Sequence, residues 1–119
     1  MVWLASPALG QTTDPKWPRE TDVVAGLAAQ YKGVPEARLW DGSRVDLLSE
    51  DTAWEADWAS KWTEAVGQSL YYSLVTRRKP GIILLIRAPD EEAHFVYRCQ
   101  AVCARHDITL SIEHVKPLR

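Results

Sequence analysis

The chain has 119 residues, of which 46% are hydrophobic and 25% are charged. These values fit one soluble globular domain and exclude disordered and fibrous proteins. The net charge of -2 and the pI of about 5.9 exclude a protein that binds DNA through bulk positive charge, although they allow a local basic patch.

The chain begins with residues 1–18, which are rich in Pro, Gly and Thr and show no hydrophobic periodicity. We expect an irregular arm here, with Trp3 or Trp17 docked on a domain that covers residues 19–119. A cytoplasmic location is slightly favoured, and export is the alternative, with residues 1–10 as a signal-peptide remnant that lacks the usual positive start. No membrane partner is expected, because no apolar run reaches the roughly 20 residues that a span needs.

The first half of the domain is predicted to be a helix followed by three strands. Apolar residues at helical spacing indicate a helix over residues 21–32. Alternating polar and apolar residues predict strands over 36–40 and 44–48, which an Asp-Gly turn joins into a hairpin. A third strand is predicted over 52–58.

The second half is predicted to alternate between helices and strands. A core stripe with a period of 3.6 indicates a helix over residues 59–77, and a continuous apolar run indicates a strand over 81–86 that is buried on both faces. A helix over 89–106 and a strand over 109–115 follow. The order α-β-β-β-α-β-α-β predicts an α/β fold, in which helices flank a mixed central sheet on both sides.

Acidic residues follow one face of the second and third predicted strands. Alternate residues of a strand share a face, so Arg44 lies with Asp46, and Glu55 lies with Asp57. If the two strands pair across their short turn, Asp46 and Glu55 lie side by side. Converging carboxylates repel unless a cation lies between them, and oxygen ligands favour Mg²⁺, for which Mn²⁺ can substitute. We therefore expect a metal site formed by Asp46, Glu55 and Asp57.

The next helix presents a polar stripe to the same region. Lys61, Glu64, Gln68 and Tyr72 follow one another at spacings of three, four and four residues, which places them on one helix face. Lys61 comes just after the strand that carries Glu55 and is expected to reach back towards the carboxylates. A lysine at this position can orient a water molecule and stabilise charge on a phosphate.

Together these segments resemble the PD-(D/E)XK nuclease superfamily, whose αβββαβ core corresponds to residues 19–87. The segments that carry the resemblance are residues 44–48, 54–58, 61–62 and 67–72. The resemblance implies a Mg²⁺-dependent nuclease that hydrolyses phosphodiester bonds in nucleic acid, with DNA favoured. It also implies metal binding by Asp46 and Glu55.

Further site residues follow from the same resemblance. The Gln-x-x-x-Tyr pattern of the RecB-like branch falls on Gln68 and Tyr72, and the first-helix carboxylate of Holliday-junction-resolvase-like members falls on Glu20. The expected catalytic residues are Asp46, Glu55, Lys61 and Gln68. The expected substrate-positioning residues are Tyr72, Glu20, Arg44 and Arg77, the arginines through phosphate contact.

The chain departs from the family pattern at Asp57, where the Glu-x-Lys motif has its lysine. Some members carry that lysine on the following helix, which makes Lys61 the natural substitute. The alternative is a catalytically inactive nuclease fold that binds nucleic acid or protein. Simpler roles also fit, since Asp57 can cap a helix and Arg77 suits a helix C-terminus. A domain this small is expected to need a partner protein or a homodimer for recognition.

Overall fold

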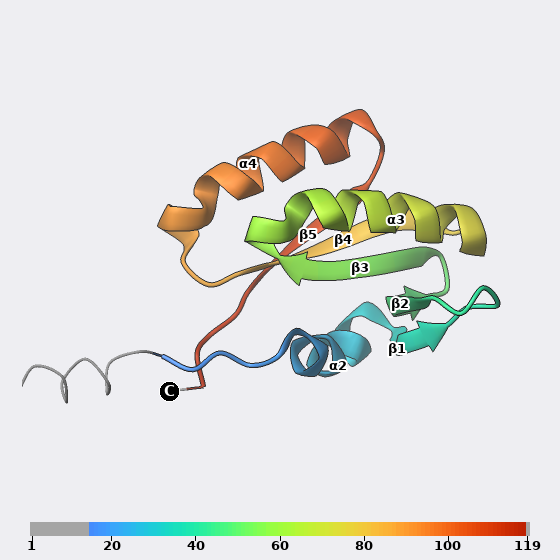
Figure 1. Cartoon of the computed structure of the whole chain (residues 1–119), viewed down its shortest axis with the longest axis horizontal. Coiled ribbons are helices and arrows are strands. Elements are labelled where there is room, and N and C mark those ends of the chain that lie inside the picture. The colour runs from blue at the N-terminus through green and yellow to red at the C-terminus, as the bar shows by residue number, and fades with distance from the viewer. Residues whose placement is uncertain (1–14, 119) are drawn as a thin grey trace, which may run out of the picture.

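The computed structural model describes residues 15–118, which form an α/β fold (Figure 1). Within these residues, three helices and five strands follow one another in the predicted order, which is confirmed. The helices are α2 (Glu20–Tyr31), α3 (Trp62–Thr76) and α4 (Pro89–Arg105). The strands are β1 (Gly33–Arg38), β2 (Arg44–Ser49), β3 (Thr52–Trp58), β4 (Lys79–Ile86) and β5 (Thr109–His114).

The strands form one mixed sheet in the order β1-β2-β3-β4-β5. The first three strands are antiparallel neighbours, whereas β4 is parallel to β3 and β5 is parallel to β4. This arrangement follows from the connections, since short turns join β1 to β2 and β2 to β3, and helices join the parallel strands. The predicted mixed sheet is therefore confirmed.

Helices cover both faces of the sheet, with α3 and α4 above it and α2 below it in Figure 1. Strand β4 supplies both cores, because its successive side chains point to opposite faces. Ile82 and Leu84 pack on the side of α3 and α4, and Ile83 and Leu85 pack on the side of α2. All four side chains are fully buried, as a strand with two covered faces requires.

Strand β1 begins earlier than predicted, at Gly33 instead of residue 36. The helix before it ends at Lys32, which adopts the left-handed conformation with a φ of 52° and donates its N–H to carbonyls of the last turn. The chain therefore passes from helix to strand without a loop. A side chain at Gly33 would contact Leu47, since an added Cβ would lie 2.8 Å from its Cγ.

Helix α3 begins later than predicted, at Trp62, because a 3-10 turn over Ala59–Lys61 separates it from β3. In the arm, Trp17 packs against the core on the α2 side, which confirms its predicted docking. Trp3 and the suggested export signal lie outside the described residues. Within residues 15–118, no helix is long and apolar enough to cross a membrane.

Candidate functional site

The candidate site forms where β2 and β3 separate. The ladder between the two strands ends with the pair of Leu47 and Trp54, and Asp46 and Glu55 are the residues directly beyond that pair. At this point the N–H of Ala56 donates a hydrogen bond of 2.9 Å to Asp46 Oδ2. Leu47 and Ala56 face α2, so Asp46 and Glu55 face the α3 side. The structure brings these two carboxyl groups together on one face.

Glu55 is buried without a hydrogen-bond partner for one of its oxygens. Its exposed fraction is 5%, and Oε1 has no partner among the described residues. Burial and the neighbouring charges of Asp46 and Asp57 raise the pKa of Glu55 to about 10. Glu55 therefore holds a proton at neutral pH in the protein alone, and its carboxyl group provides an unused ligand oxygen beside Asp46.

A second pair of carboxyl groups lies next to the first. Asp57 is 7% exposed, and its Oδ1 accepts a hydrogen bond of 2.9 Å from the N–H of Trp58. Burial, the charge of Asp57 and a hydrogen bond with Asp57 raise the pKa of Glu20 to about 8. Burial also raises the pKa of Asp57. The carboxyl group of Glu20 on the first helix therefore lies close to that of Asp57 at the end of β3.

The three carboxylates expected from the sequence to bind a metal ion do not form one complete metal site. Within residues 15–118, no three His, Cys, Asp or Glu side chains are placed to hold a metal ion. Mg²⁺, however, keeps several water molecules and commonly uses one or two carboxylates together with substrate phosphates. Asp46 and the unpartnered oxygen of Glu55 fit that donor set. Asp57 fits it less well, because Trp58 and Glu20 already engage its carboxyl group.

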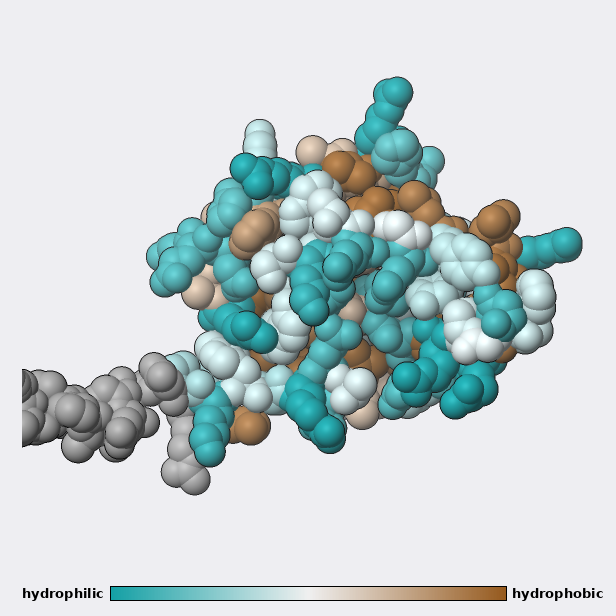
Figure 2. Space-filling model, in the orientation of Figure 1, coloured by the Kyte–Doolittle hydropathy of each residue, from teal (hydrophilic) through white to brown (hydrophobic). Residues whose placement is uncertain are grey.

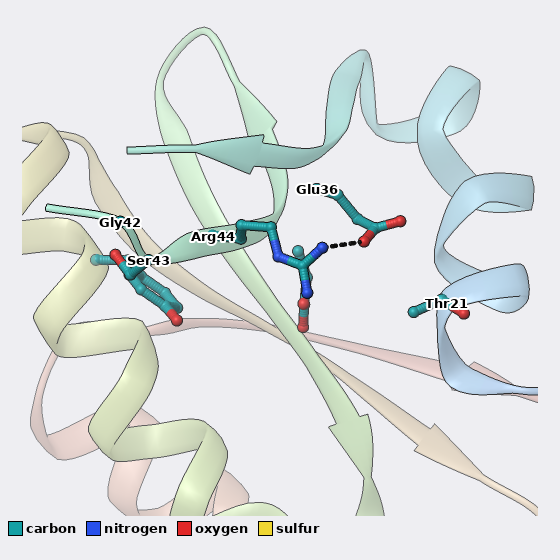
Figure 3. A pocket seen from close by; sticks show the side chains of 7 residues that line it. Thr21, Glu36, Gly42, Ser43 and Arg44 are labelled. Atoms are coloured by element: carbon teal, nitrogen blue, oxygen red, sulfur yellow. Dashed lines mark hydrogen bonds and ion pairs between the residues drawn. The ribbon is translucent and has the colours of Figure 1, made fainter. Parts of the chain in front are cut away.

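A cavity of about 330 Å³ lies next to Asp46, which lines it, whereas Glu55 is not among its lining residues (Figure 3). Asp46 and Tyr72 line it, and burial together with the charges of Glu55 and Asp46 raises the pKa of Tyr72. In its wall, Arg44 Nη1 donates to Glu36 Oε1 at 2.9 Å. The remaining lining residues are Thr21, Gly42 and Ser43. The cavity therefore combines two carboxylates, a phenol and an arginine.

The other predicted residues lie along α3 and at its ends. Lys61 is exposed at the start of the helix. Its positive charge partly offsets the rise in the pKa values of Glu20 and Asp57, so Lys61 lies near that pair. Gln68 is exposed one turn before Tyr72. Arg77 is exposed after the C-terminal end, and the 15 residues of α3 span about 22 Å. Arg77 is thus at the opposite end of the helix from Lys61.

Glu36 is the site residue that the sequence did not reveal. The register between β1 and β2 places it opposite Asp46, and its left-handed backbone, with a φ of 49°, interrupts the ladder there. Its charge contributes to the raised pKa of Asp46, for which burial is the main cause. Pairing the two strands across their Asp-Gly turn would have found it.

Comparisons with known protein families, with curated proteins and with solved structures found no match.

Proposed function

We propose that the chain is a metal-dependent nuclease that hydrolyses phosphodiester bonds in nucleic acid, with DNA favoured. The observation that carries the proposal is the buried carboxyl group of Glu55, which lies beside Asp46 with Oε1 unpartnered. A buried polar atom without a partner destabilises a fold unless something else satisfies it. A divalent cation that displaces the Glu55 proton would bind between the two carboxylates and satisfy this oxygen.

The resemblance to the PD-(D/E)XK superfamily supports the same function. That superfamily places an aspartate on one strand and a glutamate on the next, as Asp46 and Glu55 stand on β2 and β3. Its core order agrees with the order of elements from α2 to β4. The likeness of the motifs and the chemistry of the pair are independent arguments for one reaction class.

Bound Mg²⁺ would lower the pKa of a water molecule and polarise the scissile phosphate. Asp46 is held for this role by the N–H of Ala56, and Glu55 must release its proton when it becomes a ligand. Lys61 provides positive charge at the edge of the carboxylate cluster, where it can stabilise a phosphate oxygen. Tyr72 borders the cavity and positions the substrate strand, with Gln68 beside it on α3.

The test is cleavage of plasmid and single-stranded DNA with Mg²⁺ or Mn²⁺. We expect cleavage by the natural chain and its loss in Asp46→Asn and Glu55→Gln. The matched control is Glu50→Gln, because Glu50 is an exposed glutamate in the turn between β2 and β3. Equal cleavage by all four proteins would refute the assignment, and so would cleavage that persists in EDTA.

The departure at Asp57 favours a second function, a nuclease fold that binds nucleic acid or protein without catalysis. Lys61 is exposed and approaches Glu20 and Asp57, instead of standing beside Glu55 on β3. This alternative predicts no cleavage with any divalent ion. Crystals soaked in Mn²⁺ distinguish the two, because anomalous density beside Glu55 supports a working metal site.

A further inference from the structure

The turn between β1 and β2 carries a tryptophan beside the candidate site. Trp40 has an exposed fraction of 86%, although most tryptophans bury their large apolar rings. Gly42 and Ser43 of the same turn line the cavity (Figure 3). In Figure 1 this turn lies under the C-terminal half of α3. Trp40 therefore belongs to a turn that contributes two residues to the wall of the cavity that Asp46 lines.

Hydrogen bonds hold the turn in one conformation. Asp41 accepts a hydrogen bond of 3.0 Å from the N–H of Ser43 and another from the hydroxyl of Tyr71 on α3. The ring of Tyr71 packs edge-on against Tyr72, with 5.8 Å between centroids. Tyr72 lines the cavity, and Tyr71 is 46% exposed. Aromatic side chains thus continue from the cavity towards the turn that carries Trp40, on a rigid support.

Positive charge stands at the base of the same turn. Arg38 and Arg44 are direct cross-strand partners, and like charges in that position destabilise a sheet. Arg44 is neutralised by Glu36 at 2.9 Å. Arg38 forms no ion pair among residues 15–118. An anion can contact Arg38 without displacing an ion-pair partner among the described residues.

We infer that Trp40 and Arg38 form a nucleotide subsite, in which Trp40 stacks on an unpaired base and Arg38 contacts its phosphate. A ring on a single turn can reach the face of a base only when the base is not stacked in a duplex, so the subsite selects single-stranded nucleic acid or an unpaired end. The inference rests on the proposed function, because it assigns the substrate of that site.

An exposed apolar surface on α3 offers one competing explanation. Leu70 and Leu74 are 40% and 76% exposed, and hydrophobic side chains gather along the upper edge of the molecule in Figure 2, in the region of α3 and α4. Such a surface can bind a second copy of the chain. The paired arginines and the adjoining carboxylate cavity favour a nucleotide, because protein partners do not require a cation next to the exposed ring.

The experiment measures binding of a fluorescein-labelled 12-nucleotide oligo(dT) and of a 12-base-pair duplex by fluorescence anisotropy in EDTA. The proteins compared are the natural chain, Trp40→Ala, Trp40→Phe and Arg38→Ala. Tyr97→Ala is the matched control, because Tyr97 is an aromatic residue of α4 with 75% exposure. EDTA prevents metal-dependent cleavage, so binding is measured separately from the proposed reaction. Thermal unfolding verifies that each variant is folded.

We expect Trp40→Ala to weaken oligo(dT) binding by roughly 5-fold to 150-fold, the range for loss of one stacked base, and Trp40→Phe to restore most of it. Arg38→Ala should reduce the salt slope by about 0.7. Duplex binding should change little. Equal oligo(dT) affinity of Trp40→Ala and the natural chain overturns the inference. The inference is also overturned if the natural chain does not bind oligo(dT) but self-associates, and Trp40→Ala abolishes that self-association. That result assigns the surface to a second copy of the chain.

The two proposals fail separately. If the natural chain cleaves DNA and Trp40→Ala cleaves and binds single strands equally well, the subsite is wrong and the nuclease stands. If no divalent ion supports cleavage but Trp40-dependent binding persists, the subsite inference holds for a binding module, and the proposal of nuclease activity is wrong.

Discussion

Glu55→Gln is expected to stabilise the metal-free protein at alkaline pH. The folded state holds the pKa of Glu55 at about 10, against an ordinary value of 4.5, so between these values the folded protein binds a proton that the unfolded chain has released. Stability from this group is complete below the ordinary value and is lost as pH rises towards 10. The loss is at most about 1.4 kcal/mol for each pH unit, or about 2.7 kcal/mol between pH 6.5 and 8.5.

Urea unfolding at pH 5.5, 6.5, 7.5 and 8.5 in EDTA tests this reasoning. Glutamine stays neutral, so the free energy of unfolding of Glu55→Gln should fall less steeply with pH than that of the natural chain, and the two curves should diverge towards pH 8.5. Glu50→Gln, at an exposed position, should follow the natural chain. Parallel curves for Glu55→Gln and the natural chain would show that Glu55 is ionised and solvated, and the reasoning about its burial would be refuted.

Four further predictions concern the cation, the lysine and two glycines. Mg²⁺ at 100 times its Kd should raise the free energy of unfolding by about 2.7 kcal/mol. At one fixed Mg²⁺ concentration this stabilisation should be larger at pH 8 than at pH 6, because Glu55 releases its proton more readily. Calorimetry should find no stabilisation by Mg²⁺ in Asp46→Asn. Lys61→Met should lower the cleavage rate by on the order of 100-fold while calorimetric Mg²⁺ affinity is kept. Gly81→Ala should destabilise by about 1–3 kcal/mol in urea, because an added Cβ would lie 2.5 Å from the Trp54 ring. Gly67→Ala, where nothing lies within 4 Å, should stabilise by about 0.5–1 kcal/mol.

The sequence predicted those parts of the fold that depend on local periodicity. Strand β3 has the predicted bounds of residues 52–58, and the apolar run of β4 is buried on both faces as expected. The start of β1 was missed because the reversal after α2 uses Lys32, a residue type that does not usually mark a left-handed helix end. Periodicity carries no information about such a backbone choice.

The candidate site was predictable only where it follows from alternation along strands. That rule placed Asp46 and Glu55 on one face, and the register agrees. Alternation along single strands did not find Glu36, because its position opposite Asp46 follows from the pairing of β1 with β2. Nor did composition reveal Trp40, since a high tryptophan content suggests core residues and only the structure shows which ring is exposed.

Asp57 stands where the PD-(D/E)XK pattern that the chain resembles has a lysine, and this difference alters the charge of the candidate site. In the family pattern that position supplies a positive charge beside the glutamate, whereas here it adds a buried negative charge. The fold compensates with the N–H of Trp58 and the charge of Lys61, which both favour the ionised form of Asp57. These neighbours stabilise Asp57 but leave Glu55 unsatisfied. Occupancy of the site by protons or by a cation therefore depends mainly on Glu55, and the reaction that we propose requires a divalent ion to displace the Glu55 proton.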